Sequence, residues 1–229
     1  MFYFIFYPFV FVLLRSVIKF FGRLETIGAH NVPRTGPVLY CPNHLSDADP
    51  PTVFVSAPRR AWYIGKEELF DHWFWGWFFK QYRGIPIKRD SPDRGALRIA
   101  EEKLMQGYPV VVFPEGRCSQ TGTLLKLQPG AAMMSLRTGA PVVPIGIQHT
   151  NKILPYGDGK PHFSPIPVRI EYGAPIFPEE FKHLKHSDAV AALTNRIGHD
   201  LARMTNQPPP PDLERGSRRS AEKTDQTNK

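Results

Sequence analysis

Short apolar runs of strand length alternate with longer segments of helical periodicity through the middle of the chain. Four runs predict strands, at residues 38–41, 110–113, 142–145 and 168–170. Apolar residues at helical spacing predict helices at about 94–106 and 131–138. A last predicted helix carries one apolar stripe, formed by Val190, Leu193, Ile197, Leu201 and Met204. This alternation predicts an α/β domain in which helices cover a sheet.

The beginning of the chain is apolar and uncharged over residues 1–14, and Arg15, Lys19 and Arg23 follow. This run is shorter than the roughly 20 apolar residues of a membrane-spanning helix. It also lacks the preceding basic residues and the small-residue cleavage site of a signal peptide. We interpret residues 1–22 as a monotopic membrane anchor, with aromatic side chains among the acyl chains and cations at anionic head groups. A buried core helix is the alternative.

A second aromatic-rich segment, residues 70–82, contains three of the four tryptophans. Its aromatic residues occupy more than one face of a helix, which indicates either a deeply buried helix or contact with lipid. Tryptophan is enriched at the membrane–water interface. The apolar start of the chain favours membrane contact here, with ordinary core packing as the alternative.

The end of the chain has a different composition. From Gln207 onward a proline run is followed by polar and charged residues, which cannot bury enough apolar surface to fold. We therefore expect three parts: a membrane anchor at residues 1–22, one globular domain at 23–206 and a disordered polar tail at 207–229.

The charge balance favours anionic partners. In 229 residues, Lys and Arg total 29 against 21 Asp and Glu, a formal net charge of +8. Nucleic acid, phospholipid head groups and phosphorylated metabolites all fit this charge. The aromatic residues stand among aliphatic residues rather than among Lys and Arg, so we expect no nucleic-acid partner. Cys41 and Cys118 have neither disulfide nor metal-ligand spacing, so we expect a reducing compartment and no metal site.

His44 and Asp49 follow the first predicted strand and form a candidate catalytic pair. A carboxylate can hold an imidazole in one tautomer and stabilise the imidazolium, while the other ring nitrogen takes a proton from a hydroxyl. Two alternatives stay open at this point. Asp49 can be a helix cap, because the prolines after it favour a first turn, and His44 can be an ordinary loop histidine.

Two further stretches carry groups suited to phosphate. They follow extended runs and comprise Lys88 with Arg89, and Glu115 with Gly116 and Arg117. Ligands bind at strand ends in α/β sheets, Gly allows close approach of the backbone, and Arg offers a fork for phosphate oxygens. The alternatives are a solvated cation pair in the first stretch and a local ion pair in the second.

Four motifs occur in order along the chain: Asn43-His44 with Asp49, then residues 85–89, 113–117 and 140–145. Together they resemble the motifs of the 1-acylglycerol-3-phosphate acyltransferase family. The resemblance covers about residues 24–175, and four ordered motifs are far more specific than one. It implies a mixed central sheet flanked by helices. It also implies acyl transfer from acyl-CoA or acyl carrier protein to the free hydroxyl of 1-acylglycerol-3-phosphate, giving phosphatidic acid in phospholipid biosynthesis.

The resemblance further implies a role for each motif residue. His44 is the general base, Asp49 its orienting partner and Arg89 the ligand of the acceptor phosphate, whereas Glu115, Gly116 and Arg117 line the acceptor pocket. Because a donor thioester is already activated, no cofactor is expected. The expected partners are a lysophospholipid acceptor, the acyl-CoA or carrier-protein donor and a membrane phospholipid surface, with the enzyme on the cytoplasmic face of the membrane.

Departures from the usual family pattern concern the acceptor head group. The third motif more often reads Phe-Pro-Glu-Gly-Thr-Arg-Ser, whereas Arg117 stands here at the Thr place and Cys118 at the Arg place. This variant resembles the branch that acylates 2-acylglycerophosphoethanolamine. Lys88 also stands where an acidic residue is frequent. Two other acceptors therefore stay as alternatives: another lysophospholipid and an acylated amino-acid lipid. A non-catalytic lipid-binding role is the third alternative.

Two other residues in the first motif region are candidates for chemistry. Asp47 is a second possible partner for His44, although the family's four-residue gap selects Asp49. Cys41 could form an acyl-thioester intermediate. A small buried thiol at a strand end more often has a packing role, so direct transfer is the preferred interpretation.

Overall fold

The computed structural model describes residues 2–67, 71, 83–87, 94–157 and 160–211. In this part of the chain a mixed seven-stranded sheet has the order β1-β7-β6-β2-β5-β3-β4. Its strands are β1 (Glu25–Ile27), β2 (Val38–Pro42), β3 (Trp62–Lys66), β4 (Gly84–Ile87), β5 (Pro109–Val111), β6 (Val142–Gln148) and β7 (Arg169–Tyr172). Neighbouring strands pair in parallel, except that β6 and β7 are antiparallel.

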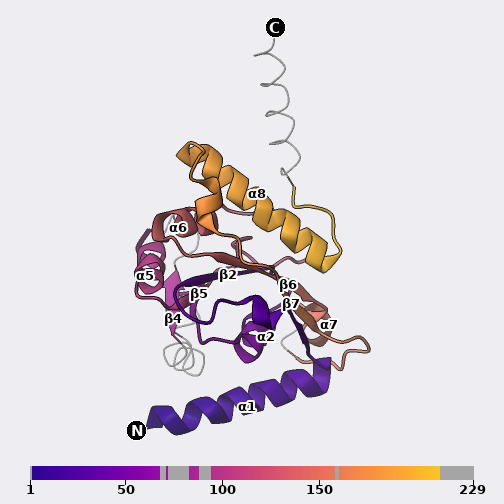
Figure 1. Ribbon diagram of the computed structural model, residues 1–229. Helices are drawn as coiled ribbons and strands as arrows, with labels where there is room; N and C mark the ends of the chain where they lie inside the picture. Colours follow the sequence, from indigo (N-terminus) through magenta and orange to yellow (C-terminus); the bar gives the residue numbers. More distant parts are fainter. Residues whose placement is uncertain (1, 68–70, 72–82, 88–93, 158–159, 212–229) are drawn as a thin grey trace.

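Helices cover both faces of the sheet (Figure 1). On one face lie α5 (Arg94–Met105), α6 (Gly130–Thr138) and α8 (His186–Thr205). On the other lie α2 (Asp49–Ser56), α7 (Thr150–Ile153) and, outside them, α1 (Phe2–Gly22). Two short 3-10 helices, η1 (Ala29–Asn31) and η2 (Pro178–Phe181), complete the described elements.

The side chains of β2 show why both faces are apolar. Successive strand residues point to opposite faces of a sheet. Leu39 and Cys41 join the core beneath α5, α6 and α8, whereas Val38 and Tyr40 join the core on the α2 side. All four are fully buried. A strand with two buried faces reads as a continuous apolar run, and this is the pattern that the sequence shows.

The predicted α/β fold with a mixed sheet and flanking helices is confirmed. The predicted helix at 94–106 corresponds to α5, and Gly107 ends it in a left-handed conformation at φ +83°. The predicted strand at 142–145 continues to Gln148, because the chain stays buried between two neighbours. The strand predicted at 110–113 ends earlier, at Val111.

Some predictions concern residues outside the described part of the chain. These are most of the aromatic segment 70–82, the pair Lys88 and Arg89, and residues 212–229 of the predicted tail. The elements β1, β3 and α7 were not predicted, whereas β4 and α2 were predicted only in part, as an extended run before Lys88 and as a helix start at Asp49. β1, for example, is three residues long with all of them exposed, so it carries no apolar signature.

The first residues of the chain form a helix that packs on the body of the domain. The rings of Phe11 in α1 and Phe54 in α2 meet edge to face with centroids 5.8 Å apart. Ile18 is buried, and the guanidinium of Arg15 donates a hydrogen bond to the carbonyl of Val55 at 2.9 Å. Within the described residues, the structure contains no helix with the length and apolar character needed to cross a membrane.

Candidate active site

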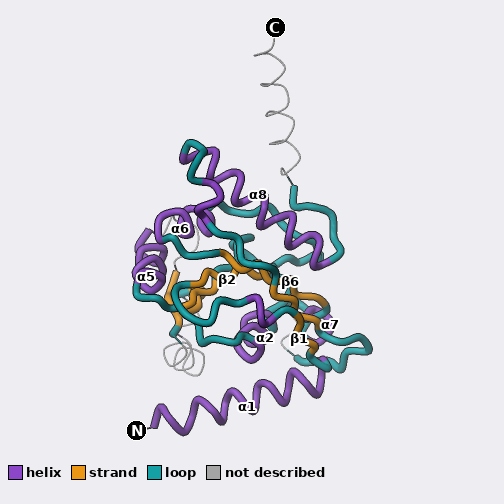
Figure 2. The backbone as a smooth tube through the Cα atoms, in the orientation of Figure 1, coloured by secondary structure: helices purple, strands orange, loops and turns teal. Residues whose placement is uncertain are grey.

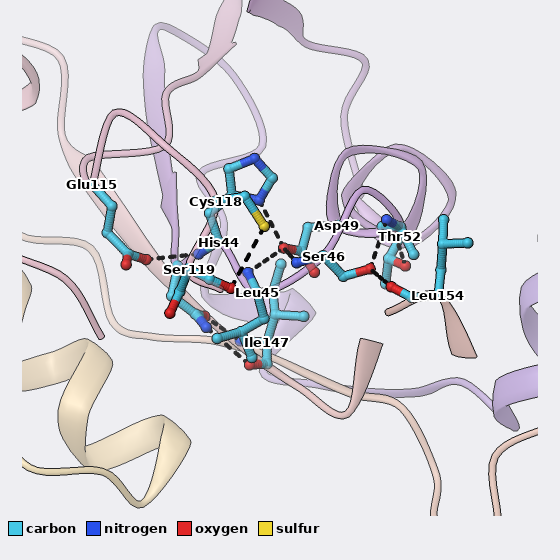
Figure 3. Close-up of polar contacts among 12 residues, drawn as sticks. His44, Leu45, Ser46, Asp49, Thr52, Glu115, Cys118, Ser119, Ile147 and Leu154 are labelled. Atoms are coloured by element: carbon cyan, nitrogen blue, oxygen red, sulfur yellow. Dashed lines mark hydrogen bonds and ion pairs between the residues drawn. The ribbon is translucent and has the colours of Figure 1, made fainter. Parts of the chain in front are cut away.

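The candidate site lies at the carboxyl ends of β2 and β5. These strands are parallel neighbours, so the loops that follow them emerge at the same edge of the sheet. This edge is where α/β sheets bind ligands. The loop after β2 carries His44, and the loop after β5 carries Glu115 (Figure 3).

Asn43 fixes the start of the loop that follows β2. Its side-chain amide donates to the carbonyl of Ile147 at 3.0 Å and accepts from the backbone N–H of the same residue at 2.6 Å. The side chain thus continues the pairing of β2 with β6 beyond the last strand residue. Asn43 is fully buried, so both bonds are shielded from water. His44 therefore leaves the sheet at a fixed position.

The imidazole ring of His44 and the carboxylate of Asp49 form the centre of the site. Nδ1 of His44 lies 2.9 Å from Oδ2 of Asp49, and the side chains are 14% and 0% exposed. An ionised carboxylate can only accept hydrogen bonds, so it places the imidazole proton on Nδ1. Nε2 then has the lone pair that accepts a proton. The structure thus brings the predicted pair into contact through Nδ1, and this contact leaves Nε2 on the side of the ring away from the carboxylate.

The Asp49 carboxylate is itself held in place by the loop. The same oxygen, Oδ2, accepts hydrogen bonds from the backbone N–H groups of Leu45 at 2.6 Å and Ser46 at 2.8 Å. Asp49 is also the first residue of α2, where the helix dipole favours a negative charge. The other oxygen, Oδ1, is buried and has no hydrogen-bond partner among the described residues. Three donors therefore converge on one oxygen.

Glu115 joins the two loops through the backbone. Its Oε1 accepts a hydrogen bond from the N–H of His44 at 2.7 Å, and its Oε2 accepts one from the N–H of Leu125 at 2.7 Å. The residue is 3% exposed. Burial raises the pKa of Glu115 to about 7, while the two amide hydrogen bonds oppose this rise. The carboxylate therefore holds the backbone of the histidine.

The loop after β5 contacts His44 in two further ways. The backbone N–H of Ser119 donates to the carbonyl of His44 at 2.8 Å. The imidazole lies against the ring of Phe113, with centroids 4.2 Å apart and the planes tilted by 30°. The turn that makes this possible contains Gly116 at φ +72°, a left-handed conformation that favours glycine. The histidine is thus constrained at its backbone and at its ring.

The other predicted site residues lie around this centre. Gly116 and Arg117 are adjacent to Glu115 in the chain, and both are exposed. Arg89 lies outside the described residues. Asp47 is exposed, and it is Asp49 that contacts the imidazole. The structure therefore brings His44, Asp49 and Glu115 together and leaves Gly116 and Arg117 at the surface of the loop.

Cys41 has the surroundings of a core residue. It is fully buried beside Leu39 and the apolar side chains of α5 and α6. Burial raises the pKa of the Cys41 thiol far above its ordinary value, which disfavours the thiolate. Since the thiolate is the nucleophilic form, the environment favours the packing role of this cysteine.

The side chain of Gln207 contacts the loop after β5, which the sequence did not predict. Its Oε1 accepts from the N–H of Leu124 at 2.8 Å, and its Nε2 donates to the carbonyl of Gly122 at 3.2 Å. The next residue, Leu125, is the one that Glu115 holds. Gln207 stands at the first position of the predicted polar tail, where composition gives no sign of a tertiary contact.

A histidine oriented by a buried carboxylate at a strand end of an α/β sheet is suited to transfer reactions that need a general base. Residues 23–148, more than half of the chain, match the Acyltransferase family. The crystal structure of the 1-acyl-sn-glycerophosphate (LPA) acyltransferase PlsC from Thermotoga maritima is similar, with a TM-score of 0.70 and 27% identity. The similarity covers 84% of this chain and 78% of that chain.

Similar proteins of known name are also acyltransferases. The 1-acyl-sn-glycerol-3-phosphate acyltransferase of Bacillus subtilis is 26% identical over 88% of this chain and 98% of its own length. A chloroplastic enzyme of the same name from Brassica napus is 33% identical. The match covers 60% of this chain and 40% of the Brassica protein. The chain belongs to the 1-acylglycerol-3-phosphate acyltransferase family and is an O-acyltransferase.

Proposed function

We propose that the protein transfers an acyl group from acyl-CoA or acyl carrier protein to the free hydroxyl of 1-acylglycerol-3-phosphate, giving phosphatidic acid. The names of the similar proteins support this acceptor. The observation that carries the proposal is the pairing of His44 with Asp49 at 2.9 Å, with the carboxylate oxygen anchored by two backbone amides. A protein that only binds lipid has no need of a histidine oriented in this way.

The proposed reaction has two proton transfers and needs no cofactor. Nε2 of His44 removes the proton of the acceptor hydroxyl while the oxygen attacks the thioester carbonyl. The tetrahedral intermediate then collapses, the carbon–sulfur bond breaks, and the imidazolium protonates the leaving thiolate. The Asp49 carboxylate stabilises the imidazolium between these steps. Positioned proton transfer of this kind contributes about 10²–10⁴-fold to the rate.

The acceptor phosphate needs cationic ligands near the histidine. Arg89 and Arg117 are the proposed ligands, because a guanidinium matches the geometry of phosphate oxygens. Gly116 leaves room for the acceptor beside Glu115, because its left-handed turn carries no side chain. Glu115 contributes mainly by holding the loop, since both its oxygens accept backbone amides.

One observation favours a different acceptor head group as the second candidate. Cys118, which stands where the family usually has arginine, is 8% exposed, whereas Arg117 is exposed. The guanidinium is therefore displaced by one residue along the loop. A displaced cation can fit a zwitterionic head group, so 2-acylglycerophosphoethanolamine is the alternative acceptor.

The lipid acceptor implies contact with a membrane, and α1 is the proposed anchor. One face of α1 packs on the domain, while Leu13 and Phe20 on the outside are 50% and 68% exposed. Basic residues follow these apolar positions, as expected for binding at anionic head groups on the cytoplasmic face.

A panel of acceptors tests the proposal. The purified full chain is incubated with labelled acyl-CoA and, separately, lysophosphatidate, lysophosphatidylethanolamine or no acceptor. Release of free thiol that depends on lysophosphatidate, with labelled phosphatidic acid as product, supports the proposal. Release only with the ethanolamine lipid supports the second candidate. No acceptor-dependent release with either lipid from acyl-CoA or acyl carrier protein would exclude both.

A further inference from the structure

α1 carries apolar side chains on two adjoining faces over residues 11–22. The inner face packs on the domain through Phe11, Leu14, Ile18 and Phe21. The outer face presents Leu13, Val17 and Phe20, which are 50%, 37% and 68% exposed. A helix that is apolar on most sides is either buried within protein or in contact with lipid. Among the described residues, the domain covers only the inner face.

A second segment adds apolar side chains next to this outer face. Phe163 and Ile166, in the loop of residues 160–167, are 63% and 42% exposed. The rings of Phe163 and Phe20 meet edge to face with centroids 6.3 Å apart. Figure 2 shows this loop beside the C-terminal end of α1. The two segments therefore form one surface, although they are far apart in the sequence.

Backbone hydrogen bonds fix the loop to the helix end. The N–H of Ser164 donates to the carbonyl of Phe21 at 2.9 Å, and the N–H of Val168 donates to that of Gly22 at 2.6 Å. The guanidinium of Arg23 donates to the carbonyl of Pro165 at 3.2 Å. A side chain at Gly22 would place its Cβ 2.7 Å from Val168. These contacts hold the loop that carries Phe163 and Ile166 against the C-terminal end of α1.

We propose that the outer face of α1 and the loop 160–167 together form a docking surface for an anionic phospholipid bilayer. The proposal rests on the proposed function and adds a second element to the anchor. Charge complementarity identifies the occupant, because Lys19 and Lys160 are exposed on the two segments that carry the apolar groups. Apolar side chains with cations beside them suit the boundary between acyl chains and anionic head groups.

This surface is one layer of side chains from the catalytic loop. Ile18 of α1 packs in a single buried cluster with Ile153, Val168 and Ala48. Ala48 directly precedes Asp49, and the hydroxyl of Ser46 donates to the carbonyl of Leu154 beside the cluster at 2.6 Å. Docking of the surface therefore brings the His44 loop close to the bilayer that contains the acceptor.

The test is binding of the purified full chain to vesicles of phosphatidylcholine and phosphatidylglycerol, measured by sedimentation. We expect Phe163→Ser to raise the lipid concentration at half-binding about tenfold, since one phenyl group loses its apolar contact. Ile166→Ser gives a smaller shift in the same direction. The matched control is Phe177→Ser, which changes an equally aromatic residue, 46% exposed, next to η2 on the opposite face of the sheet and leaves binding unchanged.

Two results would overturn the proposal. One is unchanged vesicle binding of both loop variants. The other is conversion of a dimer to a monomer by Phe163→Ser, with vesicle binding unchanged, which would make a second copy of the chain the occupant. Failure of the proposed function is measured separately, as the absence of acyl transfer to lysophosphatidate supplied as monomers below its micelle concentration, where docking is not required.

Discussion

The carboxylate of Glu115 accepts a hydrogen bond from the backbone N–H of His44 at 2.7 Å, across 71 residues of sequence. This bond connects the loop after β5 to the loop that carries the proposed base. Because its other oxygen accepts the N–H of Leu125, one buried side chain ties the His44 loop to two points of the loop after β5. The position of the histidine therefore depends on a carboxylate that does not touch its ring.

Glu115 should make stability depend on pH. Burial raises its pKa from an ordinary 4.5 to about 7, so in this range the folded state holds a proton that the unfolded chain has lost. The free energy of unfolding therefore falls as pH rises through this range, by about 3 kcal/mol. Urea unfolding at several pH values measures this effect. From acid to alkaline pH, the free energy of unfolding of Glu115→Gln should rise by about 3 kcal/mol relative to that of the wild type. A difference between the two proteins that is constant with pH would contradict the raised pKa.

Substitution of Asp49 separates orientation from charge. Three donors converge on Oδ2, so asparagine must place its oxygen there and keeps the proton on Nδ1 of His44. Asp49→Asn then loses only the charge that stabilises the imidazolium, and we expect kcat to fall roughly 10–100-fold. Asp49→Ala also loses the group that orients the His44 ring, so its kcat should fall roughly 10³–10⁴-fold. Equal kcat values for the two variants would show that orientation by the carboxylate is not what matters.

Gln207 should act as a positioning residue for the loop of Glu115. Gln207→Ala removes the acceptor of the Leu124 N–H and the donor to Gly122. We expect about 1 kcal/mol less stability and a roughly threefold to tenfold lower kcat, with KM for the acyl donor unchanged. The matched control is Gln106→Ala, which removes an exposed glutamine at the end of α5. A stability loss with kcat at the wild-type value would limit Gln207 to a structural role.

Cys41 should be dispensable for the chemistry. The thiol is fully buried in the core, so Cys41→Ala removes one sulfur atom from packing and no reacting group. We expect kcat within about twofold of the wild type and a stability loss of about 1 kcal/mol. Mass spectrometry after acid quench during turnover should find no acyl group on Cys41. An acylated Cys41 peptide would establish a covalent intermediate instead of direct transfer.

The sequence predicts those parts of the fold and site that depend on local pattern. The strands at 38–41 and 142–145 and the helix at 94–106 are regular apolar patterns, and the His44–Asp49 pair is only five residues apart. The contact between them forms inside one loop and the start of one helix. Such features need no knowledge of which strands are neighbours.

The parts that could not be predicted depend on strand order. β2 and β5 are adjacent in the sheet although β3 and β4 lie between them in the chain. This adjacency is what brings Glu115 to the His44 backbone, and no local pattern encodes it. The same holds for Gln207, whose contact with Leu124 depends on where the C-terminal end of α8 meets the loop. The family resemblance implies that Glu115 lines the acceptor pocket, and this stays a prediction; the contacts of its two oxygens with backbone amides were not predicted.

The most direct test is the activity of His44→Ala. The assay measures thiol released from acyl-CoA in the presence and absence of lysophosphatidate, with circular dichroism to show that the variant is folded. If His44 is the base, the lysophosphatidate-dependent rate should fall by about 10³-fold while the fold is retained. A folded His44→Ala variant with a rate near that of the wild type would contradict general-base catalysis by His44.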